Sequence, residues 1–287
     1  MTSTSGSTRL SAEAVRRAAV ITHGRPGTIG PALSRVEAVA RAAGVELVFP
    51  PDEVSKHAIH EAPHELVDAE LVVVLGGDGT MLRALHRLLG TGIPAIGVNF
   101  GRVGFLTAIA EAELEARLPG VFAGGYRVIE LPTLELELDG EQRFAVNDVV
   151  AASSSVGRTV ELAWTVGGED LGRQACDGII CSTPAGSTAY NLSNGGPVLV
   201  WGLDAIAVTF IAPHSLRTRS MVVPRGLDVV VTNRTPDVAA TVLFDGRQVG
   251  GLPPASSAVV RLGEQQSLLA TLPEVTFFHR YRTTFTD

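Results

Sequence analysis

Residues 71–89 form one continuous pattern that limits the fold more than any other stretch. Leu71–Leu75 is an uninterrupted apolar run, which predicts a strand buried on both faces of a sheet. The turn Gly76-Gly-Asp-Gly-Thr80 follows, and apolar residues then recur at helical spacing as far as Leu89. A strand that leads through glycines into a helix is typical of a parallel α/β sheet, and its glycines let the backbone approach a ligand closely.

The turn allows two interpretations. A helix that starts here directs unpaired N–H groups and the positive end of its dipole outward, which favours a phosphate site with Asp78 beside it. Alternatively, the turn is only a tight connection, and Asp78 caps the helix.

The two halves of the chain differ in pattern. Residues 12–128 alternate short apolar runs with helical patterns, which predicts an α/β domain with a mostly parallel sheet. Ligands of such sheets bind beyond the carboxyl ends of the strands, where the glycine turn lies. Residues 129–272 show short alternating segments separated by Gly, Pro, Asn and Asp, which predicts a β-rich domain. We expect a disordered tail over residues 1–11 and a segment over 273–287 that returns to the first domain.

Composition excludes several classes of protein. The 287 residues are 45% hydrophobic and 18% charged, as in globular proteins, and the net charge of −7 argues against nucleic acid as the main partner. No apolar run is long enough to span a membrane, and residues 1–8 lack the apolar core of a signal peptide. We therefore expect a cytoplasmic protein, with Cys176 and Cys181 reduced.

Two further loops contain cations near the expected strand ends. Gly97-Val-Asn-Phe-Gly-Arg-Val-Gly104 follows an apolar run, so that Asn99 and Arg102 could meet a phosphate, although an irregular loop fits equally well. Arg25 follows the first strand and could reach the same edge, although a solvated loop is favoured. The histidines at 57, 60, 64 and 86 show no metal-ligand spacing and are expected at the surface.

Two polar segments interrupt the β-rich half. Asn147-Asp148 lies inside an apolar run and needs hydrogen-bond partners, which either a β-bulge or the hydroxyls of a ribose would supply. Asp177–Ser193 predicts a strand, a Pro/Gly turn and a helix that Ser187 and Thr188 cap, with free amides facing a ligand or with a purely structural role.

Four of these segments, in this order, closely resemble the motifs of the NAD kinase family. They are Gly76–Thr80, Gly97–Leu106, Asn147-Asp148 and Asp177–Tyr190. The resemblance covers residues 15–285 and includes the later turn Phe244-Asp-Gly-Arg247. The first motif is shared with diacylglycerol-type lipid kinases, whereas Ser182-Thr-Pro-Ala-Gly-Ser-Thr-Ala-Tyr190 is far more specific. The resemblance implies an enzyme that transfers the γ-phosphoryl group of ATP to the 2′-hydroxyl of the adenosine ribose of NAD, giving NADP. It also implies Asp78 as general base, Mg²⁺ carried by ATP, and a homodimer or homotetramer.

The resemblance further implies a set of binding residues. Those for NAD are Asp78, Gly79, Phe105, Asn147, Asp148, Arg158, Ala175, Asp177, Thr188, Ala189, Tyr190, Asn191, Leu192, Ser193 and Arg247. Those for the phosphates of ATP are Arg25, Gly76, Gly77, Gly79, Thr80, Asn99 and Arg102. Within the first set, Asn147 and Asp148 would bind ribose hydroxyls, Asp177 the nicotinamide end, and Phe105 would pack near the adenine.

The chain departs from the family pattern at a few positions. Asp148 stands where Glu is usual, and Ala185 where Thr or Ser is common. Ala175 stands where many members carry Arg or Lys, a charge that Arg247 could supply instead. Substrate preference therefore stays open, including NAD against NADH and ATP against polyphosphate. A lipid kinase and a non-catalytic NADP-binding sensor are the alternative functions.

Overall fold

The computed structural model describes residues 8–10, 13–24, 26–60, 62–101, 104–155 and 157–286. The chain divides into two compact units. Among the described residues, 8–130 and 267–286 form the α/β unit, and 131–266 form the β unit. Two long strands, β7 (Arg127–Leu138) and β18 (Ser257–Thr271), have residues in both units. The α/β unit is therefore built from two stretches that are distant in the sequence.

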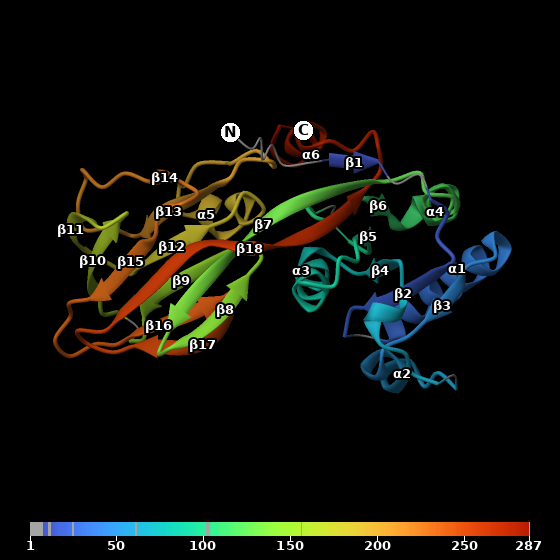
Figure 1. Ribbon diagram of the computed structural model, residues 1–287, viewed down its shortest axis with the longest axis horizontal. Coiled ribbons are helices and arrows are strands. Elements are labelled where there is room, and N and C mark those ends of the chain that lie inside the picture. Colours follow the sequence, from blue (N-terminus) through green and yellow to red (C-terminus); the bar gives the residue numbers. More distant parts are fainter. Residues whose placement is uncertain are drawn as a thin grey trace. The chain divides into compact units, whose positions relative to one another are not determined.

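A parallel sheet forms the centre of the α/β unit (Figure 1). Its strands are β2 (Arg17–Thr22), β3 (Glu46–Val48), β4 (Leu71–Leu75) and β5 (Ala95–Asn99), in the order β3-β2-β4-β5. Leu269 of β18 pairs in parallel with Ala95, and the short β6 (Ile109–Ala110) pairs in parallel with the end of β5. Leu75 is in register with Thr22 on one side and Val98 on the other, so these three strands end at one edge. The predicted parallel sheet is confirmed.

Helices cover both faces of this sheet. Helix α1 (Pro26–Ala43) packs against α4 (Leu114–Phe122), which a 3₁₀ turn (Glu111–Glu113) precedes, and both share a core with the strands. Helix α3 (Asp78–Arg87) contacts β2, β4 and β5, and its Met81 lies toward Gly97. Because Gly97 and its neighbours Ile96 and Val98 face opposite sides of the sheet, α3 lies on the face opposite to α1.

Three short elements complete the α/β unit. Helix α6 (Phe277–Phe285) begins at Thr276, whose Oγ1 accepts a hydrogen bond from the backbone N–H of His279 at 3.1 Å. The sequence pattern did not predict α2 (Pro51–His57) or the 3₁₀ turn Leu66–Asp68. Strand β1 (Thr8–Leu10) pairs antiparallel with residues 127–129, although it falls within the expected disordered tail. Residues 1–7 and 11 of that tail lie outside the described residues.

The β unit contains two antiparallel sheets. Their orders are β14-β13-β12-β9-β16-β17 and β8-β7-β18-β15-β10-β11. The bounds are β8 (Glu141–Ala145), β9 (Asp148–Ser153), β10 (Val160–Val166), β11 (Glu169–Cys176), β12 (Gly178–Ser182), β13 (Ala205–Ile211), β14 (Met221–Pro224), β15 (Val229–Asn233), β16 (Ala240–Phe244) and β17 (Arg247–Leu252). Side chains from both sheets, among them Leu162, Ile179 and Val208, form one core, so the β-rich prediction is confirmed.

The helical pattern after Gly186 is much shorter than the sequence suggested. A 3₁₀ turn covers Gly186–Thr188, and α5 (Tyr190–Ser193) is a single helical turn. No helix in the described ranges is long and apolar enough to cross a membrane.

Candidate functional site

The carboxylate of Asp78 binds a loop of the α/β unit rather than the helix that it begins. Its Oδ2 accepts the backbone N–H of Phe105 at 2.6 Å, and its Oδ1 accepts those of Leu106 at 3.0 Å and Thr107 at 3.3 Å. The residue before it, Gly77, is the N-cap of α3, and no side chain caps this helix. The interpretation of Asp78 as a helix cap is therefore wrong. We call residues 104–107 the Asp78 loop.

Two glycines let the backbone approach this acid and its turn. A Cβ on Gly104 would lie 2.1 Å from Oδ1 of Asp78, and one on Gly76 would lie 2.5 Å from Oγ1 of Thr80. Both separations are shorter than any real carbon contact. The third glycine of the Gly97–Gly104 loop is thus required by the position of the Asp78 carboxylate, which its spacing in the sequence did not reveal.

The structure narrows the expected set of phosphate-binding amides. The N–H of Gly76 donates to the carbonyl of Val98 at 3.0 Å, and that of Thr80 donates to the carbonyl of Gly77 at 2.9 Å. The N–H groups of Gly77 and Gly79 have no partner within the residues that the structure describes. These two amides at the positive end of α3 can donate hydrogen bonds to an anion.

The other residues expected near the phosphates have different surroundings. Asn99 is buried at the end of β5, and its Nδ2 donates to the carbonyl of Gly101 at 3.1 Å. Arg25 and Arg102 lie outside the described residues. His57 was expected at the surface, but its side chain is buried and its Nε2 lies 2.8 Å from Oγ1 of Thr22, beside the buried carboxylate of Glu53.

A single carboxylate fixes the Asn147-Asp148 turn of the β unit. Asp245 accepts the backbone N–H groups of Val146 at 3.0 Å, Asn147 at 2.7 Å and Asp148 at 3.1 Å. Its own N–H donates to the carbonyl of Asp148 at 3.1 Å, and its φ is 45°. The turn connects β8 to β9, so it is not a β-bulge within one strand. Asp245 was visible in the sequence only as part of the Phe244-Asp-Gly-Arg247 turn.

The side chains of this turn are buried polar groups. Asn147 is 9% exposed, and its Oδ1 accepts no hydrogen bond from any described residue. Asp148 is 5% exposed, and its burial, reinforced by the charge of Asp245, raises the pKa of Asp148 to about 7. A buried carbonyl oxygen without a donor is costly, so a ligand hydroxyl at Asn147 would remove that cost.

The segment Ser182–Ser193 packs tightly on the same turn. A Cβ on Gly186 would lie 2.2 Å from the carbonyl oxygen of Asn147, and Thr183 donates from Oγ1 to the carbonyl of Val146 at 2.7 Å. Ser187 was expected to cap a helix, and this expectation is wrong. Its buried hydroxyl donates instead to the carbonyl of Pro184 at 2.8 Å. Thr188 is not a cap either, and its Oγ1 donates to the carbonyl of Ala185 at 3.3 Å.

Asn191 is a structural residue of this segment. It is fully buried, its Nδ2 donates to the carbonyls of Ser187 at 3.1 Å and Pro197 at 2.9 Å, and its Oδ1 accepts Oγ1 of Thr209 at 2.8 Å. The side chain therefore holds the turn from inside.

The remaining expected residues divide by exposure. Of the β unit, Arg158, Asp177, Ala189, Tyr190, Ser193 and Arg247 are exposed, and Ala175, Thr188 and Leu192 are partly buried. Arg158 pairs with Asp237 at 2.7 Å. In the α/β unit, Phe105 is 6% exposed, and its ring packs against that of Phe277 with centroids 5.3 Å apart. The Phe105 ring is therefore covered by α6.

Comparison with known proteins identifies the family. Models described as the ATP-NAD kinase N-terminal and C-terminal domains match residues 39–126 and 146–272. The NAD kinase of Ralstonia nicotianae is 39% identical over 249 residues, which is 82% of this chain and 78% of that protein. The chain belongs to the NAD kinase family. The NAD kinase of Heliobacterium modesticaldum is 38% identical and covers 78% of this chain and 82% of its own length.

Solved structures agree with this family assignment. The yeast NADH kinase complexed with NADH has a TM-score of 0.82 and 20% identity, covering 96% of this chain and 89% of its own, which supports the fold. The NAD kinase from Archaeoglobus fulgidus in complex with ATP has a TM-score of 0.74 and 26% identity, covering 94% and 97%. The lipid-kinase and non-catalytic-sensor alternatives find no support among these relatives.

Proposed function

We propose that the protein transfers the γ-phosphoryl group of ATP to the 2′-hydroxyl of the adenosine ribose of NAD, producing NADP. Membership of the NAD kinase family supports the reaction class. The observation that carries the mechanism concerns Asp78, the first residue of α3. Its carboxylate is held by three backbone N–H groups of the Asp78 loop. We also expect the enzyme to act in the cytoplasm as a homodimer or homotetramer.

Asp78 serves as the general base. An ionised carboxylate offers about four lone-pair positions, and three are used by the Asp78 loop, which leaves one for a substrate hydroxyl. As the 2′-oxygen attacks the γ-phosphorus, its proton passes to Asp78, and the bond to the β-phosphate oxygen breaks to release ADP. The three amides fix the direction of the accepting oxygen before the substrate arrives.

The donor is MgATP. Phosphate oxygens would accept the N–H groups of Gly77 and Gly79, where the dipole of the ten-residue helix α3 favours negative charge. The described part of the chain contains no cluster of three or more His, Cys, Asp or Glu side chains that could hold a metal. In this proposal Mg²⁺ arrives with the nucleotide substrate as MgATP.

The β unit binds the dinucleotide. The unpartnered Oδ1 of Asn147 would accept a ribose hydroxyl, and Asp148 would hydrogen-bond to a second one. The exposed side chains of Asp177, Tyr190 and Arg247 remain candidates for contacts with the rest of the dinucleotide. Asn191, with its amide fully used, would act by holding the segment in place.

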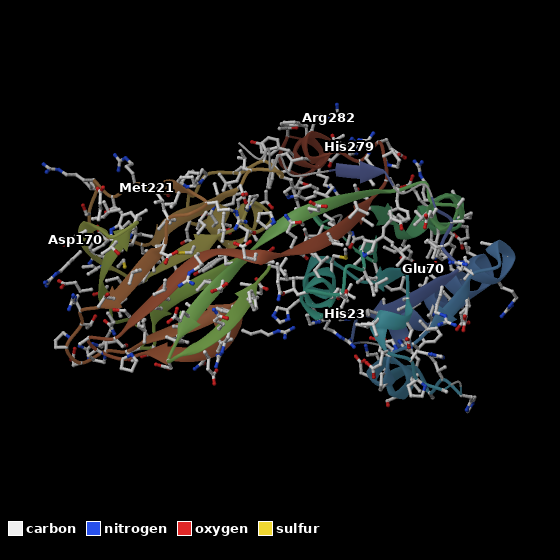
Figure 2. All side chains as sticks on the ribbon, in the orientation of Figure 1. His23, Glu70, Asp170, Met221, His279 and Arg282 are labelled. Atoms are coloured by element: carbon white, nitrogen blue, oxygen red, sulfur yellow. The ribbon has the colours of Figure 1, made fainter. Side chains whose placement is uncertain are left out.

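A coupled assay tests the proposal. The protein is incubated with NAD and MgATP, and glucose-6-phosphate dehydrogenase reports NADP. Asp78→Asn should lower kcat about 100-fold or more, with KM for NAD changed only a few-fold, because the amide cannot accept the proton. The matched control is Asp170→Asn, an exposed acid of the β unit (Figure 2). Absence of NADP with the unmodified protein would contradict the proposed function.

A further inference from the structure

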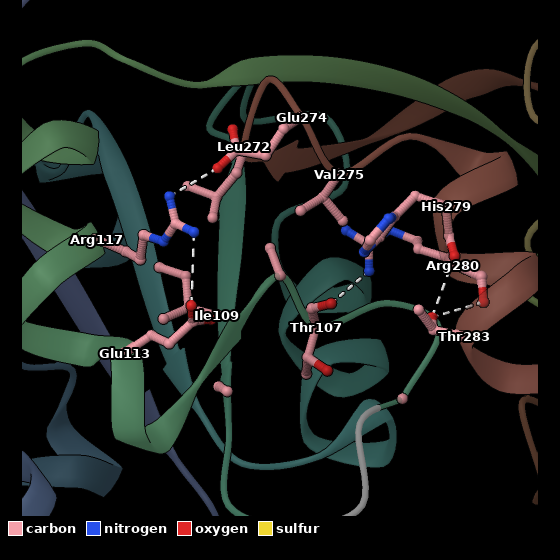
Figure 3. Close-up of a pocket in the computed structure, with 13 residues that line it drawn as sticks. Thr107, Ile109, Glu113, Arg117, Leu272, Glu274, Val275, His279, Arg280 and Thr283 are labelled. Atoms are coloured by element: carbon pink, nitrogen blue, oxygen red, sulfur yellow. Dashed lines mark hydrogen bonds and ion pairs between the residues drawn. The ribbon is translucent and has the colours of Figure 1, made fainter. Parts of the chain in front are cut away.

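The guanidinium of Arg280 lies inside the α/β unit, against the Asp78 loop. Arg280 projects from α6 and is 3% exposed. Its Nη1 donates to the carbonyl of Thr107 (Figure 3) and to the carbonyl of Phe105 at 2.8 Å. Its Nη2 donates to Oγ1 of Thr271 at 2.7 Å. An arginine distant in sequence therefore binds the same short loop as Asp78.

The Asp78 loop binds two opposite charges through its backbone. Its N–H groups donate to Asp78, and its carbonyls accept from Arg280. The peptide group between Phe105 and Leu106 donates its N–H to Asp78 and accepts Arg280 at its carbonyl. Thr107 also donates its N–H to Asp78, and its carbonyl, which belongs to the next peptide group, accepts Arg280. A cation on the carbonyl end polarises a peptide group and strengthens the hydrogen bond at its N–H end. Arg280 thus strengthens the contact of the Leu106 N–H with Asp78 and anchors the loop that supplies the other two.

The cost of burying this cation indicates that it has a defined role. Burial lowers the pKa of Arg280 to about 10, and the charge of Asp78 acts in the opposite direction. The guanidinium consequently stays charged at neutral pH. An interior position for a charge is expensive compared with an apolar residue of similar size, and Arg can hold two carbonyls at once where Lys offers a single point.

We propose that Arg280 is a positioning residue for the catalytic base, acting through the backbone of the Asp78 loop. This inference rests on the proposed function of Asp78. In this proposal Arg280 acts on the base and makes no contact with the substrate. Its effect on the reaction is to keep the accepting oxygen of Asp78 in one direction.

The surroundings of Arg280 allow a test by chemical rescue. A cavity of about 450 Å³ adjoins Arg280 and is lined also by Thr107, Ile109, Leu272 and Thr283, all residues of the α/β unit (Figure 3). Truncation of Arg280 to alanine would connect the vacated space with this cavity. A free guanidinium ion is small enough to enter and to reach the two carbonyls.

The expected results concern kcat rather than substrate affinity. Arg280→Ala should lower kcat about 100-fold with KM for NAD and ATP within about 3-fold, because a displaced base costs rate. Arg280→Lys should keep about a tenth of the kcat, since one donor remains near the loop. Millimolar guanidinium chloride, far below denaturing concentrations, should raise the kcat of Arg280→Ala about tenfold. Neutral urea at the same concentration should leave it unchanged.

Matched variants separate positioning from general damage. Arg282→Ala removes an exposed arginine of the same helix and should keep the activity of the unmodified protein (Figure 2). Asp78→Asn should not respond to guanidinium. An unchanged kcat of Arg280→Ala, or a loss of kcat that guanidinium does not reverse, would overturn the proposal.

Hydrogen exchange gives a readout that needs no substrate. The amides of Phe105, Leu106 and Thr107 should exchange faster in Arg280→Ala than in the unmodified protein or in Arg282→Ala, because the loop loses its carbonyl anchor. Unchanged exchange at these amides would overturn the role of Arg280. If the unmodified protein makes no NADP, the proposed function fails by itself, and hydrogen exchange still decides whether Arg280 holds the loop.

Discussion

At the scale of single residues, Asp148 combines burial with a second acid. Burial and the charge of Asp245 raise the pKa of Asp148 from 3.8 to about 7. The folded protein therefore holds this proton more tightly than the unfolded chain does. The resulting stabilisation is present at low pH and is lost as the pH rises from about 4 to about 7.

Asp148→Asn should remove this pH dependence. We compare the free energy of unfolding of the variant with that of the unmodified protein at each pH. Between pH values of about 4 and about 7, the difference should grow in favour of the variant by at most about 4 kcal/mol, since each pKa unit corresponds to about 1.4 kcal/mol. Urea unfolding at several pH values measures it, with Asp170→Asn as control. Parallel pH profiles for the Asp148 variant and the unmodified protein would contradict the assignment.

Gly104 is a second residue whose substitution has a defined outcome. A methyl group there would lie 2.1 Å from Oδ1 of Asp78, so Gly104→Ala must displace the carboxylate or the loop. We expect kcat to fall about 100-fold, as for Asp78→Asn. Gly101→Ala is the control, because a Cβ at Gly101 meets no atom within 4 Å. Equal activity of the two alanine variants would show that the Asp78 position is not needed.

At the scale of elements, α6 depends on one N-cap. Oγ1 of Thr276 accepts the N–H of His279, and the helix carries Phe277 and Arg280 into the unit. Thr276→Ala should lower the free energy of unfolding by about 1 kcal/mol and increase exchange in the Asp78 loop. Thr284→Ala changes an exposed position of the same helix and should be neutral in thermal unfolding. A similar loss in both variants would argue against the cap.

Patterns local in sequence predicted the elements well, and contacts distant in sequence were missed. The apolar run 71–75 and its glycine turn predicted β4 and the start of α3 because strand burial and helix spacing leave a periodic signal. The partners of Asp78 could not be predicted in this way, since backbone amides carry no sequence signal. Nothing in the sequence indicated the partners of Arg280 and Asp245, and Ser187 was expected to cap a helix until the fold showed which groups face it.

At the scale of the whole molecule, the two units have separate hydrophobic cores. The β unit is one continuous stretch, residues 131–266, whereas the core of the α/β unit includes Ala270 and Leu272 from beyond that stretch. A polypeptide of residues 131–266 should therefore unfold cooperatively by itself. A polypeptide of residues 1–130 should not, because it lacks part of its sheet, its core and α6.

Circular dichroism during urea unfolding checks both fragments. A broad, non-cooperative profile for residues 131–266, or a sharp one for residues 1–130, would contradict this division. The sequence predicted the change of pattern near residue 129. It could not show that residues after 266 complete the parallel sheet of the α/β unit. That depends on the pairing of Leu269 with Ala95, which no local periodicity encodes.

The separation of Thr107 and Arg280 by 173 positions also has a consequence during synthesis. A ribosome adds roughly 5–20 residues per second, so the Asp78 loop exists for roughly 9–35 s before its arginine is made. The intervening residues form the β unit, which can fold during that interval. The β unit can therefore be folded before Arg280 is synthesised, and in the mechanism proposed above the Asp78 carboxylate becomes fixed only after that point.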